Sequence, residues 1–107
     1  MPIELPFIQG QLVVVVLREP RERYWGKLMG LEAAGIAQRG LELSQWEQAL
    51  SLIKNAETGQ IALGTRFFPM HRVVSLYLDE AECGVESLGD AFLRRTGLSP
   101  QEFLEEG

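Results

Sequence analysis

The chain has 107 residues and a net charge of −5, and 46% of its residues are hydrophobic, which indicates one globular domain rather than a disordered segment. Its longest apolar run, "LVVVVL" at 12–17, is far shorter than the roughly 20 residues that a membrane helix needs, so we expect no membrane span. The first residues lack the basic start of a secretory signal, and Cys83 is the sole cysteine, so we expect a cytoplasmic protein without a disulfide.

The charge is unevenly distributed along the chain. Residues 1–78 hold eight Lys/Arg against seven Asp/Glu, whereas residues 79–107 hold two against eight. An acidic balance argues against tight, nonspecific binding of nucleic acid, which depends on neutralising phosphates. It leaves room for a small local basic site.

Three strands are predicted before residue 44. The β-branched run at 11–17 is the first, 22–31 is the second and 35–43 is the third, with Ile36 and Leu41 or Leu43 buried. In the second strand, alternation places Tyr24, Gly26, Leu28 and Gly30 on one face and Trp25, Lys27, Met29 and Leu31 on the other. Glycines inside a strand mark a bend or a close backbone approach, so we expect strong curvature there.

The pattern then becomes helical at 45–54, where Ser44 and Glu47 form an S-x-x-E capping box. Trp46 is expected to hold this inserted helix against the strands. Two further strands are predicted at 60–68 and 72–80, separated by Pro69, with Val73, Ser75 and Tyr77 opposite Val74, Leu76 and Leu78.

Two caps predict the C-terminal helices. Ser87 opens a helix at 87–96 that Gly97 ends, and Ser99 followed by Pro100 opens a second helix at 99–105. A ligand pocket or an interface is one possible role of Trp25, Trp46, Phe67, Phe68 and Tyr77, but we expect most of these aromatic residues in the core.

Two segments, "GKLMGLEAAGI" at 26–36 and "FFPMHRVVSL" at 67–76, resemble the two motifs of the Sm-like family of small β-barrels (LSm and Hfq-type). The resemblance implies a mainly β fold with helices, namely a five-stranded SH3-type barrel over 1–80 that includes the inserted helix 45–54. The acidic helical extension 81–107 would pack on the same domain. Glu32 stands where the family has Asp, and the family's base-binding Asn has no counterpart.

The resemblance implies a non-enzymatic homo-oligomer in which strand 60–68 of one copy pairs with strand 72–78 of the next. Its site would comprise Arg66, Met70, His71 and Arg72, repeated around a ring, and would bind RNA or a protein partner. The acidic tail predicts that RNA binding is weak. The alternative is an acidic protein-interaction or regulatory adaptor with no nucleic-acid role, whose partner surface would be 87–105.

No residue set specifies a reaction. His71 has no second histidine beside it, and Cys83 lies in a different segment, so no nucleophile and base pair is evident. One histidine and one cysteine cannot form a zinc site of the usual four ligands, and Asp79, Glu80 and Glu82 are expected to be a solvated edge. Arg18, Arg21 and Arg23 alternate with glutamates and are expected in a solvated hairpin. We therefore expect no enzyme activity, no metal and no cofactor.

Overall fold

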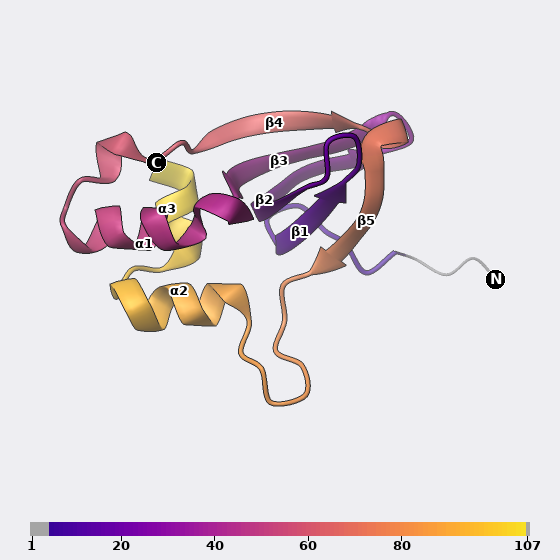
Figure 1. Ribbon diagram of the computed structural model, residues 1–107. Helices are drawn as coiled ribbons and strands as arrows, with labels where there is room; N and C mark the ends of the chain where they lie inside the picture. Colours follow the sequence, from indigo (N-terminus) through magenta and orange to yellow (C-terminus); the bar gives the residue numbers. More distant parts are fainter. Residues whose placement is uncertain (1–4, 107) are drawn as a thin grey trace.

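The computed structural model describes residues 5–106 as one five-stranded antiparallel sheet with helices gathered at one side of it (Figure 1). The strands are Leu12–Leu17 (β1), Glu22–Glu32 (β2), Gly35–Glu42 (β3), Gly64–Pro69 (β4) and Val73–Leu78 (β5). The α-helices are Trp46–Lys54 (α1), Leu88–Thr96 (α2) and Pro100–Glu106 (α3). Short 3-10 helices lie at Leu43–Gln45, Thr58–Gln60 and Met70–Arg72.

The sheet is strongly curled. Its strand order is β4-β3-β2-β1-β5, so β4 and β5 are at opposite ends although they follow each other in the chain. In a flat sheet two strands four places apart are separated by about 19 Å. The 3-10 helix Met70–Arg72 that joins them advances only about 6 Å. The sheet must therefore bend until the end of β4 meets the start of β5, as Figure 1 shows.

Apolar side chains cover both faces of the sheet. On one face, Val14, Val16, Trp25 and Leu41 pack against Ala49, Leu50 and Ile53 of α1, Phe92 of α2, and Phe103 and Leu104 of α3. On the other face, the buried cluster consists of strand residues alone: Val13, Val15, Leu17, Tyr24, Leu28, Ile36 and Phe68. Strand β1 contributes to both clusters, which explains its continuous apolar sequence.

The five strands and three helices expected from the sequence are confirmed, but the fourth strand begins at Gly64 instead of residue 60. The segment before it forms a 3-10 helix at Thr58–Gln60. The fifth strand ends at Leu78, so Asp79 and Glu80 lie outside the sheet.

Two face assignments were wrong because of bulges. The β2–β3 register shifts between Leu28 and Gly30, so Leu31 packs in the cluster of Leu28 rather than on the face of Trp25. The β1–β5 register shifts between Val16 and Leu17, so Val73 shares the cluster of Leu76, and Val74 is 54% exposed. One extra residue in a strand reverses the alternation beyond it.

The capping box at Ser44 is also wrong. Helix α1 begins after Gln45, with no side-chain cap, and the Ser44 hydroxyl donates to Glu42 instead. The other caps are confirmed: Ser87 Oγ accepts from the backbone N–H of Asp90, and Gly97 ends α2 at φ 77°. Trp46 packs edge-on against Trp25 with their ring centres 5.2 Å apart, which confirms that it joins α1 to the sheet.

Candidate binding groove and basic hollow

Asp79 ties the end of β5 to the start of α2. Its Oδ1 accepts from the backbone N–H of Leu88, and its Oδ2 accepts from that of Gly89, each at 2.7 Å. The same Oδ2 accepts from Nε1 of Trp25 at 3.1 Å. A carboxylate at a helix N-terminus satisfies amides that have no partner within the helix, and its charge suits the helix dipole. The strand end, the helix start and the fully buried Trp25 are thus held together.

A tight turn lies between Asp79 and α2. Glu82 and Val85 exchange two backbone hydrogen bonds of 3.0 and 2.7 Å. Cys83 and Gly84 between them have φ values of 48° and 80°, which close the turn in the left-handed region. Val85 is 69% exposed and Cys83 is an exposed free thiol.

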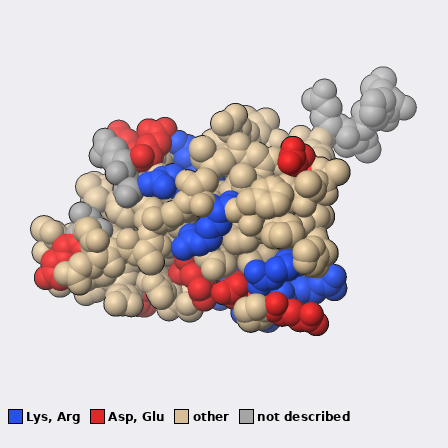
Figure 2. All heavy atoms as spheres, turned by 90° about the horizontal axis from the view of Figure 1, so that it is seen from above, with Lys and Arg blue, Asp and Glu red and all other residues tan. Residues whose placement is uncertain are grey.

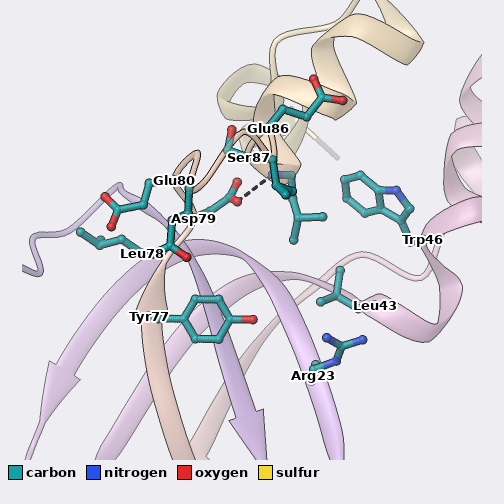
Figure 3. Close-up of a pocket in the computed structure, with 12 residues that line it drawn as sticks. Arg23, Leu43, Trp46, Tyr77, Leu78, Asp79, Glu80, Glu86 and Ser87 are labelled. Atoms are coloured by element: carbon teal, nitrogen blue, oxygen red, sulfur yellow. Dashed lines mark hydrogen bonds between the residues drawn. The ribbon is translucent and has the colours of Figure 1, made fainter.

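A groove of about 380 Å³ opens between the sheet, α1, and the segment that runs from β5 to α2. Half of the lining residues are apolar or aromatic: Leu43, Trp46, Tyr77, Leu78, Val85 and Leu88. The other half are polar or charged: Arg23, Ser87 and the four carboxylates of Asp79, Glu80, Glu82 and Glu86. Figure 3 shows Leu43, Trp46, Tyr77 and Arg23 around one space, with Glu80 beyond the end of β5 and Glu86 beside α2.

The two aromatic residues of the groove differ in how they are held. Trp46 is half-buried and fixed from behind by Trp25 and by Phe92, whose ring centre is 6.2 Å away. Tyr77 is 43% exposed, and its hydroxyl makes no hydrogen bond with residues 5–106. Tyr77 is therefore an exception to the expectation that most of the aromatic residues lie in the core. The register puts it on the helix-covered face, opposite Val14, at a place that the helices leave open.

The charges around the groove are only partly compensated. Glu86 pairs with Arg94, whose hydrogen bond to the carboxylate lowers the pKa of Glu86 below its ordinary value. Within residues 5–106, neither Arg23 nor the exposed Glu80 and Glu82 make an ion pair. The lining of the groove thus includes one cation, the exposed Arg23, and two carboxylates, Glu80 and Glu82, that make no ion pair in this part of the chain.

The four residues proposed as a site from the sequence do not converge on one place. The half-buried Arg66 donates to the carbonyl of Gly40 at 3.1 Å, and its guanidinium lies 5.0 Å from the centre of the Tyr24 ring. Arg72 pairs with Glu22 at 3.1 Å and also donates to the carbonyls of Arg18 and Pro20. Both guanidinium groups are thus engaged within the chain.

His71 and Arg72 lie together with Arg18 and Glu19 around a surface hollow of about 380 Å³ at the junction of β4 and β5. His71 is exposed, and its carbonyl accepts from Nε of Arg18 at 3.0 Å. Met70, at the start of the same 3-10 helix, is 37% exposed. Figure 2 looks onto the side of the molecule that carries β4, and there basic and acidic atoms lie beside one another without forming a continuous basic surface.

The helices at 87–105 were the other predicted partner surface. Phe92, Phe103 and Leu104 are buried against the sheet, whereas Leu93 and Leu98 remain 49% and 42% exposed. Sequence spacing did not predict the groove, because its residues come from three separate parts of the chain, at 23, 43–46 and 77–88. The one sequence signal for it was the possible pocket role of aromatic residues such as Trp46 and Tyr77.

No protein-family model, curated protein or solved structure matches this chain. Among residues 5–106, no group of three His, Cys, Asp or Glu side chains is arranged to hold a metal ion. In the same part of the chain, no helix combines the length and the apolar character needed to cross a membrane.

Proposed function

We propose that this chain is a non-enzymatic binding module that assembles with copies of itself through β4 and β5. The observation that carries the proposal is the pair of open sheet edges. Among the described strands, β4 pairs only with β3, and β5 pairs only with β1. An open edge presents unpaired N–H and C=O groups, which another strand can satisfy.

The side chains of the two edge strands support the same proposal. Phe67 on β4 is 52% exposed and Val74 on β5 is 54% exposed. Large apolar side chains exposed along open edges favour association, because pairing would bury them together with the backbone groups.

An Sm-like, SH3-type barrel is the architecture that we infer for each subunit. It is supported by the strand order and by the short 3-10 connection that draws the two ends of the sheet together. It is also supported by the second cluster, in which Phe68 of β4 and residues of β1 and β2 form one buried group without any helix residue.

The proposal predicts that the wild-type protein is an oligomer in solution by light scattering at tens of micromolar. Val74→Glu and Phe67→Glu, each placing a charge on an exposed edge position, should give smaller particles with an unchanged far-ultraviolet circular dichroism spectrum. Leu93→Glu is the matched control, because Leu93 is similarly exposed but lies on α2. A wild-type protein that is strictly monomeric would refute the proposal.

RNA binding is the second candidate function, supported by the hollow that Arg18, His71 and Arg72 share. Because Arg72 already donates to Glu22 and to two carbonyls, phosphate contacts would depend mainly on Arg18, with His71 stacking on a base. So few contacts per subunit predict weak, salt-dependent binding. In a fluorescence anisotropy titration with single-stranded RNA, the double change Arg18→Ala with His71→Ala should abolish binding. Arg21→Ala is the control and should retain more of the RNA affinity than the double change. No binding of RNA by the wild type would exclude this candidate function.

A further inference from the structure

The groove beside Tyr77 has features of a preformed ligand site that the self-association proposal does not use. Its back wall is Trp46, which the buried Trp25 and Phe92 hold in place. Its far wall is the exposed turn between β5 and α2, which the two Glu82–Val85 hydrogen bonds close and which ends where Asp79 caps α2. A wall that is held by packing, as Trp46 is, loses little conformational freedom when a ligand binds.

Apolar surface in the groove lacks a partner in the monomer. Tyr77 is 43% exposed and Val85 is 69% exposed, and both line the groove together with the half-buried Trp46. A groove of about 380 Å³ has room for one large side chain. An aromatic ring inserted between Trp46 and Tyr77 would bury apolar surface and gain ring–ring contacts.

The charges decide which ligand the groove favours. Glu80 and Glu82 at the rim make no ion pair within residues 5–106, and Glu86 beside them is neutralised by Arg94. The lining holds four carboxylates, those of Asp79, Glu80, Glu82 and Glu86, against the single cation of Arg23, so the local charge at this rim is negative. The unpaired Arg23, on the side of Leu43, can donate to the carbonyls of a bound backbone.

We propose that this groove binds a peptide segment of a partner protein that inserts an aromatic side chain between Trp46 and Tyr77 and places adjacent basic residues against Glu80 and Glu82. The groove is lined by side chains, whereas edge-strand pairing uses backbone N–H and C=O groups, so the peptide titration tests this proposal separately from self-association.

The test is a nuclear magnetic resonance titration of the ¹⁵N-labelled full chain, because its two tryptophans provide a direct reporter and an internal reference. The probe is an eight-residue peptide with blocked ends that has one phenylalanine next to two lysines, and serine and glycine elsewhere. The indole N–H signal of Trp46 should shift saturably, with a dissociation constant of about 1 mM or below. The signal of the buried Trp25 should move less.

Matched peptides and variants separate this proposal from nonspecific binding. Replacing the phenylalanine with serine should abolish the shift, and replacing the lysines with glutamates should weaken binding at least tenfold. Tyr77→Ala should also weaken it, and Glu80→Gln with Glu82→Gln should weaken it about threefold to tenfold. Glu32→Gln with Glu102→Gln, which removes two charges away from the groove, should have little effect. No saturable shift of Trp46, equal binding of the glutamate peptide, or unchanged binding by Tyr77→Ala would each overturn the proposal.

Discussion

Replacing Asp79 with asparagine tests the contact that holds β5, α2 and Trp25 together. The substitution keeps the size of the side chain but removes its charge and one of its two acceptor oxygens. Asp79 is half-buried, so water can replace part of the hydrogen bonding that the two helix amides lose. Three N–H groups, those of Leu88, Gly89 and the fully buried Trp25, then share one acceptor oxygen, and a buried N–H left without an acceptor costs about 1–3 kcal/mol. The weakened helix cap adds about 1 kcal/mol.

We therefore expect Asp79→Asn to lower the free energy of unfolding by about 3 kcal/mol, which lowers the melting temperature by about 12 °C for a domain of this size. Urea unfolding followed by circular dichroism measures the difference. Glu80→Gln is the control, because it removes the same charge at the next position, where the side chain is exposed, and it should change stability by less than about 0.5 kcal/mol. An effect of Asp79→Asn no larger than that of Glu80→Gln would show that the carboxylate does not support Trp25.

Two further substitutions test the packing of the strands and the contact between the helices. Gly26→Ala should destabilise the fold by about 1–3 kcal/mol in the same urea assay, because its Cβ would lie 2.2 Å from the carbonyl oxygen of Arg39. Gly30→Ala is the control and should be close to neutral, because its Cβ would meet only the Cβ of Ala37, at 3.8 Å. Equal effects of the two substitutions would contradict the packing argument. Arg95 of α2 donates to both carboxylate oxygens of Glu47 on α1 and lowers the pKa of Glu47 below its ordinary value of 4.5. The stability that this pair contributes is therefore present above pH 4.5 and is lost as the pH falls through the lowered pKa. The free energies of unfolding of wild type and Glu47→Gln should differ at pH 7 and converge in acid. A difference that does not depend on pH would count against the pair.

The sequence was sufficient to predict the elements, because their signals are local. The alternation and β-branching of 12–17, the helical spacing around Leu50, and the caps at Ser87 and Gly97 each depend on residues that are neighbours in the chain. The capping box at Ser44 shows the limit of such signals. Its spacing was correct, but a 3-10 helix at Leu43–Gln45 took the place of the expected first turn, and the hydroxyl turned to Glu42.

What only the tertiary structure decided depends on register and on contacts between distant segments. Two bulges, near Met29 and near Val74, reversed the faces of Leu31 and Val73, and nothing in the alternation marks an inserted residue. From the sequence, Arg72 was predicted to be a cation available for binding. The curl of the sheet instead brings it to Glu22, which is fifty positions away in the chain. Asp79 fixes the start of α2, because its carboxylate accepts from two helix amides and from the Trp25 indole. With α2 in that position, the helices leave Tyr77 uncovered, and the groove lies beside it.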